Sequence, residues 1–314
     1  MSAPPGTLAS RGGAPVRPTF LPFSRPSIGA REKQLAMEAL ESGWITTGPR
    51  AHELGERIAA MAGARHGLAL NSATGGLHLA LAALGVGPGD EVVTSTYTFV
   101  ACVNVIEHVG ARPVLVDVEP DTLCLDPGAV ERALTPRTRA VMPVDYGGHP
   151  ADLDAIGAFC RERKLWFVVD AIQQLGAFPI DVGRTPVDVL VTGGHKWLNA
   201  PFGAGFMYIR PAVRDRLRPS VAGYLSVDPP PGGWAEYFRT PSITPLQPVA
   251  FTSGARRYET GGTGNYPGAA GLAASLDLIN GLGPAAIADH IVGLTGLLIE
   301  GLSSLPVRVV TPRA

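Results

Sequence analysis

The chain has 314 residues, of which 46% are hydrophobic, and its formal net charge is −1 at pH 7. Near-neutral charge without a basic patch argues against nucleic acid as the main partner, and no apolar stretch approaches the ~20 residues that cross a bilayer. Residues 1–19 lack the apolar centre of a signal peptide and are predicted to form a disordered tail. We therefore expect a cytoplasmic protein without nucleic-acid or membrane partners.

Apolar runs rich in valine and leucine alternate with amphipathic stretches through the first two thirds of the chain. Strands are predicted at 66–70, 91–95, 112–118, 139–146, 165–170 and 187–193, and helices at 75–84, 99–108, 127–134 and 152–163. The strands lack strict polar–apolar alternation, which is typical of strands buried on both faces. This rhythm predicts an α/β fold with three layers (α/β/α) and a mostly parallel sheet.

The later part of the chain is less regular. Residues 226–248 form a proline-rich excursion with little periodicity, predicted to be a surface loop or a partner-contact segment. A helix is predicted at 268–279. A long helix follows it, because apolar residues recur there at helical spacing: Ile287, Ile291, Leu294, Leu298, Leu302 and Leu305. The last residues, VRVVTPRA, are predicted to begin a strand.

Polar residues that could carry chemistry follow the predicted strands. Asp170 ends one strand, His195 and Lys196 follow the next, and NSATGG (71–76) joins a strand to a helix. Ligands of open parallel sheets bind beyond the carboxyl ends of the strands. A lysine in a dehydrated pocket can form a Schiff base, a buried carboxylate can keep a pyridine nitrogen protonated, and a helix start suits a phosphate. Together they predict a pyridoxal phosphate site with Lys196 as the catalytic residue.

Each feature taken alone has a simpler interpretation. A strand-terminal aspartate is usually a helix cap, NSATGG alone is usually a cap and turn, and Lys196 could belong to an ordinary loop. The common position of these residues at strand ends favours the cofactor. Three cysteines, Cys102, Cys124 and Cys160, are too widely spaced for a zinc site or a CxxC motif, so we predict reduced, mostly buried thiols and no metal site.

The sequence also resembles two related enzyme families. Residues 22–156 resemble the DegT-type sugar aminotransferases in NSATGGLHLALAALGVGPGDEVV, TYTFVA and YGGHPADLDAI. Residues 160–312 resemble the class V aminotransferases, which include cysteine desulfurases and an amino-acid epimerase, in VVDAIQQLGAFPIDV, VDVLVTGGHKWLNAPFGAGFMYIRP and RYETGGTGNYPGAAGLAASLDLI. Both families share one fold and one cofactor. The resemblance therefore implies a pyridoxal-phosphate-dependent transferase of fold type I.

The resemblance implies a role for several residues around the cofactor ring. Lys196 matches the Schiff-base lysine, and Asp170 matches the partner of the ring nitrogen. Gln173 matches the residue that hydrogen-bonds the ring hydroxyl, and His195 matches a class V residue beside the cofactor. Phe99 matches the aromatic side chain that stacks on the ring, although it could instead pack in the core.

Other matches concern the phosphate. Thr74 and Gly75 match the phosphate-binding turn. Thr263 and Asn265 match a loop that reaches the phosphate of the neighbouring subunit, which implies a homodimer. The chain departs from class V in its spacing around that loop, which has one more glycine, and at Gly193, where these enzymes often have a serine two residues before the histidine; Thr192 is the nearest hydroxyl.

The predicted function is an aminotransferase that moves an amino group from an amino acid donor to a keto-sugar or small keto-acid acceptor. Two alternatives stay open at this point: a lyase, desulfurase or epimerase of the class V group, and a non-catalytic relative. A desulfurase needs a mobile nucleophilic cysteine, and all three cysteines fall in predicted helices or a short turn.

Four segments are predicted along the chain: a tail (1–19), an N-terminal arm (20–50), a large cofactor-binding domain (51–284), and an interdomain helix with the start of a small C-terminal domain (285–314). The resemblance implies that this small domain is incomplete and the chain truncated. The alternative is a compact variant whose N-terminal arm completes the sheet.

Overall fold

The computed structural model describes residues 67–214 and 265–310 without interruption. It also describes shorter stretches: 9–15, 17–20, 22, 28–43, 53–57, 216–217, 219, 223, 226–237, 239, 250–253 and 255–258. The predicted tail at 1–19 and the arm at 20–50 lie partly outside the described residues, and Thr263 lies outside them.

Seven strands form one sheet in the order β1–β7–β6–β5–β4–β2–β3. They are β1 (Leu68–Leu70), β2 (Glu91–Ser95), β3 (Arg112–Val116), β4 (Thr138–Met142), β5 (Trp166–Asp170), β6 (Val189–Gly193) and β7 (Gly205–Ile209). Strands β2 to β6 are parallel to one another, and β7 runs antiparallel to both β1 and β6. The prediction of a mostly parallel sheet is confirmed.

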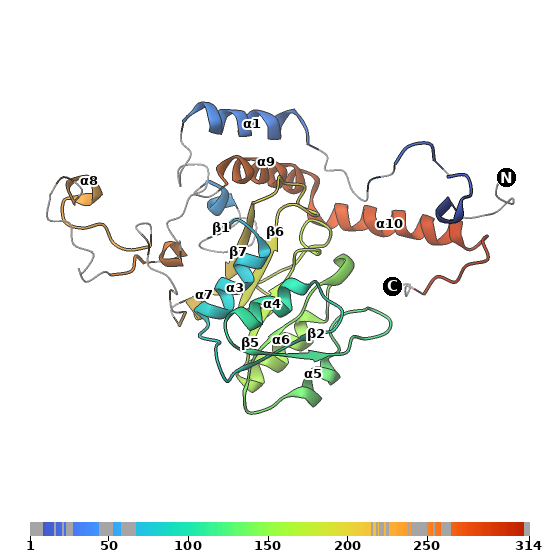
Figure 1. The fold of residues 1–314 in the computed structure, drawn as a ribbon, viewed down its shortest axis with the longest axis horizontal. Helices are drawn as coiled ribbons and strands as arrows, with labels where there is room; N and C mark the ends of the chain where they lie inside the picture. The colour runs from blue at the N-terminus through green and yellow to red at the C-terminus, as the bar shows by residue number, and fades with distance from the viewer. Residues whose placement is uncertain are drawn as a thin grey trace.

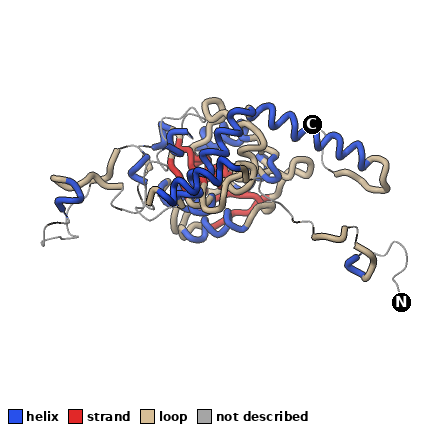
Figure 2. The backbone as a smooth tube through the Cα atoms, turned by 90° about the horizontal axis from the view of Figure 1, so that it is seen from above, coloured by secondary structure: helices blue, strands red, loops and turns tan. Residues whose placement is uncertain are grey.

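Helices cover both faces of this sheet (Figures 1 and 2). On one face, α3 (Ala73–Ala83) and α4 (Val100–His108) pack against alternate strand residues such as Val92 and Val168. On the other, α5 (Pro127–Ala133), α6 (Leu153–Arg163) and α9 (Tyr266–Leu282) pack against the intervening residues, Val93 and Val169 among them. Successive side chains of a strand point to opposite faces, so a strand that is apolar throughout contributes side chains to the hydrophobic core on each face. The three-layer prediction is confirmed.

The described part of the N-terminal arm contains α1 (Ala30–Glu41), which lies alongside α9 (Figure 1). Leu35 of α1 is buried against Ala270 and Ala274 of α9. The small alanine side chains leave room for the leucine, and burying it contributes about 1.5–3 kcal/mol. The arm is thereby attached to the helical layer that also covers β6 and β7.

The predicted long C-terminal helix is α10 (Pro284–Leu302), which projects away from the sheet (Figure 1). Among the residues that the structure describes, it is the one helix whose length and composition would allow it to cross a membrane, so the prediction that no apolar stretch approaches this length is wrong for this segment. The strand predicted after it is wrong for residues 307–310, which form no strand. A strand needs a neighbour for its backbone hydrogen bonds, and none pairs with this segment in the described chain.

The proline-rich excursion contains a short helix, α8 (Gly233–Tyr237), which lies far from the sheet in Figure 1. None of its five residues is buried. The segment begins with an ordered contact, since Val227 forms an isolated antiparallel bridge with Phe251. The prediction of a surface segment is confirmed for residues 228–237, while most of 238–249 lies outside the described residues.

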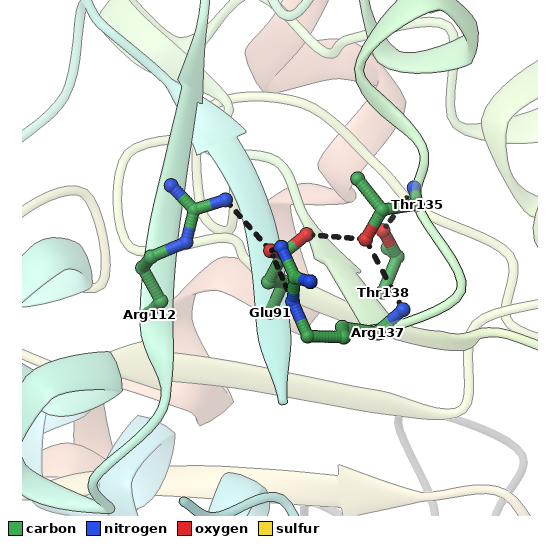
Figure 3. A network of polar contacts seen from close by, with 5 residues as sticks. All are labelled: Glu91, Arg112, Thr135, Arg137 and Thr138. Atoms are coloured by element: carbon green, nitrogen blue, oxygen red, sulfur yellow. Dashed lines mark hydrogen bonds and ion pairs between the residues drawn. The ribbon is translucent and has the colours of Figure 1, made fainter. Parts of the chain in front are cut away.

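A polar network closes the amino-terminal end of the sheet (Figure 3). The carboxylate of Glu91, the first residue of β2, is buried and accepts hydrogen bonds from Arg112 (2.6 Å) and from Nε and Nη2 of Arg137 (2.9 and 2.6 Å). Its second oxygen accepts the hydroxyl of Thr135 at 2.6 Å. These donors, the Thr135 hydroxyl first, lower the pKa of Glu91 to about 2. The network joins β2, β3 and the start of β4 at the end of the sheet opposite the predicted site.

Candidate active site

The carboxyl ends of β5 and β6 bring the central predicted residues together. Asp170 is the last residue of β5, and Lys196 follows β6 within the turn after Gly193. The two strands are parallel neighbours, with Asp170 aligned with Val191. Asp170 and Lys196 lie close enough to influence each other electrostatically. The carboxylate and the amine therefore share one edge of the sheet, as the sequence predicts.

Asp170 is a buried carboxylate with one donor on each oxygen. Its side chain is 3% exposed, Oδ1 accepts the Ile172 N–H at 3.1 Å, and Oδ2 accepts the Cys102 thiol at 3.3 Å. Burial raises the pKa of Asp170, and the two donors and the charge of Lys196 oppose that rise. Residues 172–177 form turns, so the alternative in which Asp170 caps a following helix is wrong. A buried acid near a lysine amine suits a site for a protonated ring nitrogen.

Lys196 lies in a turn that the backbone holds closed. Gly194 donates to the carbonyl of Ala204 (2.8 Å) and accepts from the N–H of Ala200 (2.9 Å), while Asn199, at φ +51°, donates to the carbonyl of Lys196 (3.0 Å). The lysine side chain is partly buried. Burial lowers its pKa, against the opposing effect of Asp170. An amine with a lowered pKa loses its proton more readily than a surface lysine does, and Schiff-base formation requires the unprotonated amine.

His195 lies beside this turn and stacks on Phe202, with ring centroids 5.3 Å apart and planes 26° apart. Gly193 precedes it where class V enzymes often have a serine. A Cβ at this position would lie 3.3 Å from the His195 ring and 3.2 Å from Ile172, so glycine leaves space for that ring. Thr192 is fully buried and alternates with Val191, which faces α3. Thr192 therefore lies on the face of β6 opposite the one that packs against α3.

The start of α3 lies close against the sheet. Ser72 is its N-cap and accepts the Gly75 N–H at 3.1 Å. A Cβ on Gly76 would lie 2.5 Å from side-chain atoms of both Leu70 and Val191, so only glycine allows this approach. Thr74 and Gly75 are exposed in the first turn. An exposed helix start is suited to an anion, because its N–H groups point outward along the helix dipole.

Gln173 and Phe99 present free groups at the same edge. Gln173 Oε1 accepts the N–H of Gly147 at 3.1 Å, which leaves the amide NH₂ as the group that can donate to a ligand. Phe99, the N-cap residue of α4, is 63% exposed. It does not pack in the core, so its ring face is available for stacking.

Asn265 lies at the start of α9, beside the loop that follows Lys196. It caps α9 by accepting the Gly268 N–H at 3.0 Å, and its Nδ2 donates to the carbonyl of Phe202 at 2.6 Å. Gly203, at φ +81°, makes room for this amide, since a Cβ there would lie 2.6 Å from Nδ2. Both groups of Asn265 are thus engaged within one chain, where they connect the loop after Lys196 to α9.

Three contacts at this edge are absent from the predicted site. They are the Cys102 thiol on Asp170, the Gly147 N–H on Gln173, and a pair of rings, Tyr97 and Tyr146, with centroids 4.2 Å apart. Glycines after a strand hint at a turn near Gly147. No sequence signal indicates the partner of the thiol, because that contact joins residues from two distant elements.

Residues 26–181 match the model of the DegT/DnrJ/EryC1/StrS aminotransferase family. The matched region extends past the predicted boundary at residue 156 and includes Asp170 and Gln173. The aminotransferase TlmJ from Streptoalloteichus hindustanus is 28% identical; the match covers 82% of this chain and 66% of that one, with a TM-score of 0.63. The chain is a fold type I aminotransferase.

Two further solved structures resemble this aminotransferase. The putative sugar aminotransferase Spr1654 from Streptococcus pneumoniae, in its PLP form, is 26% identical over 83% of this chain and 67% of that chain, with a TM-score of 0.65. A cysteine desulfurase from Thermococcus onnurineus NA1 is 22% identical over 92% and 74%, with a TM-score of 0.73. The second likeness concerns the fold alone. The resemblance to the DegT-type aminotransferases is confirmed, and for the class V group the shared fold is confirmed.

The residues of the aminotransferase site fit its cofactor, pyridoxal 5′-phosphate. The buried Asp170 carboxylate suits the ring nitrogen, the partly buried Lys196 amine suits the aldehyde carbon, and the exposed start of α3 suits the phosphate. When bound, the cofactor supplies an electron sink for negative charge that develops on a substrate carbon. Within the described residues, no group of three histidine, cysteine or acidic side chains could hold a metal ion.

Proposed function

We propose that this aminotransferase moves an amino group from an amino acid donor to a keto-sugar or small keto-acid acceptor, with Lys196 as its catalytic residue. The observation that carries the proposal is the common position of the buried Asp170 and of Lys196 at the carboxyl ends of two neighbouring parallel strands, close enough to affect each other electrostatically. The likeness to a putative sugar aminotransferase supports the keto-sugar.

Each remaining site residue receives a proposed role. Thr74 and Gly75 bind the cofactor phosphate, Phe99 stacks on the ring, and Gln173 donates its NH₂ to the ring hydroxyl. The Lys196 amine, once free of the cofactor, takes a proton from the substrate carbon and returns it. Its lowered pKa supports that role, because a base must be without its proton to accept one.

His195, Thr263 and Asn265 belong to the proposed surroundings of the cofactor. His195 lies beside it, and Thr263 and Asn265 approach the phosphate of a neighbouring subunit. We further propose a cytoplasmic homodimer in which residues 20–50 form an arm, 51–284 the large domain, and 285–314 the segment that contains the interdomain helix. Sedimentation of the cofactor-loaded protein tests the dimer, and an active monomer would contradict it.

A lyase or epimerase reaction of the class V type is the second candidate, since the later half of the chain resembles that group. A desulfurase is disfavoured by the cysteines. All three are buried, and burial raises the pKa of Cys102, of Cys124 to about 11 and of Cys160 to about 12. The thiolate is the reactive form of cysteine, and none of these thiols provides it at neutral pH.

The test of the proposed function uses the small number of lysines. The sequence contains three: Lys33, Lys164 and Lys196. After cofactor addition and borohydride reduction, peptide mapping should find the cofactor on Lys196 alone. The control variant K33R/K164R should bind cofactor as the wild type does, and K196A should lose the covalent adduct and all transfer activity. Label on another lysine, or a colourless protein after cofactor addition, would exclude the proposal.

Transamination and lyase chemistry are then distinguished by a half-reaction. Incubation of the loaded protein with amino donors should shift the cofactor absorbance to that of the amine form and release one keto acid. If no donor produces this form and the substrate is cleaved or racemised instead, the class V alternative is correct.

A further inference from the structure

Cys102 contacts two residues of the proposed site from the first turn of α4. Its backbone N–H donates to the carbonyl of Phe99 at 3.1 Å, and its thiol donates to Asp170 Oδ2 at 3.3 Å. Both Cys102 and Asp170 are almost completely inaccessible to solvent, at 0% and 3%. The thiol therefore joins α4 to the end of β5 where water cannot compete for the bond.

The direction of this bond follows from the two groups. Burial, followed by the negative charge of Asp170, raises the pKa of the Cys102 thiol, so the sulfur keeps its proton and acts as the donor. The other carboxylate oxygen is fixed by the Ile172 N–H. With one donor on each oxygen, the carboxylate plane cannot rotate without breaking a bond, and each donor favours the charged form.

We propose that Cys102 is a positioning residue: its thiol orients the Asp170 carboxylate toward the cofactor ring, and its helix holds that carboxylate in a fixed relation to Phe99. The inference rests on the proposed function, because it gives Asp170 and Phe99 the roles stated there. In this proposal the buried cysteine supports an active-site acid through a hydrogen bond and takes no part in nucleophilic or redox chemistry.

Four variants separate this role from simple packing. C102A removes the donor, C102S keeps a hydroxyl donor of similar size, D170N removes the charge of the acceptor, and C160A is the matched control. Cys160 is equally buried, but it lies on α6 in the core on the opposite face of the sheet. C160A therefore loses a buried thiol without altering Asp170.

The first measurement needs no cofactor. In the apoprotein, the infrared S–H stretching band that disappears in C102A should lie at lower wavenumber than the band that disappears in C160A, because a carboxylate acceptor weakens the S–H bond. D170N should move the Cys102 band and leave the Cys160 band in place. A Cys102 band that D170N does not move would overturn the proposal, whether or not the cofactor binds.

The second measurement uses the loaded enzyme. Compared with wild type, C102A should bind cofactor about five- to tenfold more weakly, which corresponds to the loss of one hydrogen bond of ordinary strength, since a thiol is a weak donor. Its kcat should fall by a similar factor with KM for the amino donor little changed, and the pH at which the bound cofactor's absorbance changes should shift. C102S should restore all three, and C160A should leave them at wild-type values.

The outcomes distinguish the two proposals. If wild type binds no cofactor, the proposed function fails, and the infrared result alone decides whether the thiol holds Asp170. If wild type binds cofactor and C102A behaves as C160A does, the proposed function stands and the positioning role is wrong. If C102A does not fold, C102S and D170N still provide the comparison, and a C102S protein with weakened binding and an unchanged pH profile would overturn the proposal.

Discussion

Replacing Glu91 with glutamine should destabilise the fold at the end of the sheet opposite the active site. The carboxylate accepts bonds from Arg112, Arg137 and Thr135 (Figure 3). Glutamine has nearly the same size, so packing is kept. Its NH₂ group, however, must face one of these donors, which leaves a buried polar group without an acceptor.

The magnitude follows from the geometry. The Glu91 side chain is 1% exposed, whereas those of Arg112 and Arg137 are 62% and 59% exposed, so water screens the outer side of both ion pairs. Each such pair contributes about 0.5 kcal/mol, and the unsatisfied buried group costs about 1–3 kcal/mol. We expect a total loss of about 2–4 kcal/mol at pH 7. For a chain of this size, that loss lowers Tm by ~4–8 °C.

The pH dependence has a definite sign. The pKa of Glu91 in the folded state is lowered to about 2 from its ordinary value of 4.5. Its contribution is therefore complete above pH 4.5 and is lost as the pH falls toward 2. Thermal melts of wild type and E91Q should differ by a constant amount from pH 8 to about pH 5 and converge below that range.

The control is E131Q, which breaks the more exposed pair between Glu131 and Arg163. That change should alter Tm by less than ~1 °C, since exposed pairs contribute little. The reasoning is refuted if E91Q and E131Q have equal effects, or if the difference between wild type and E91Q does not diminish in acid.

Three further results are expected. G76A should destabilise the protein by about 1–3 kcal/mol and weaken cofactor binding, because a Cβ would lie 2.5 Å from side-chain atoms of Leu70 and Val191 beneath the start of α3. The control G281A adds a Cβ in open space and should be neutral or stabilising. Equal urea midpoints for the two variants would contradict the prediction. N265A should cost about 1–2 kcal/mol in urea unfolding with the same m-value, because it removes a cap and a bond to the loop after Lys196. The three thiols should be unreactive toward Ellman's reagent in the native protein and all react after denaturation; rapid reaction of the native protein would show an accessible thiol.

Most of the fold could be predicted because its signals are local. The runs at 91–95 and 187–193 form β2 and β6 because β-branched residues are buried there on both faces. Strand β7 is missing from the predicted elements, although GFMYI is an apolar run that ends before Pro211. It follows the glycine-rich segment that contains Lys196, and glycines are typical of turns and do not indicate that a strand begins. The strand predicted after α10 is wrong because a strand depends on a neighbour, which a local pattern cannot supply.

The site could be predicted residue by residue, but its internal contacts could not. The position of Asp170 and Lys196 at strand ends follows from parallel topology, since the carboxyl ends of such strands meet at one edge. The thiol of Cys102 reaches Asp170 from another layer, and the amide of Asn265 reaches back to Phe202. Such contacts depend on the spacing between layers and on rotamers, which are set by packing and leave no periodic trace in the sequence.

The acidic residues at the two ends of the sheet differ in their hydrogen bonds and in the direction of their pKa shifts. Glu91, at the amino end, has donors on both oxygens and a lowered pKa. At the carboxyl end, burial raises the pKa of Asp145 to about 7, its Oδ2 has no hydrogen-bond partner among the described residues, and burial also raises the pKa of Asp170. Buried acids at that end destabilise the empty protein. For Asp170, a bound ring that carries a proton on its nitrogen would offset this cost, so cofactor binding should stabilise the fold at the carboxyl ends of the strands.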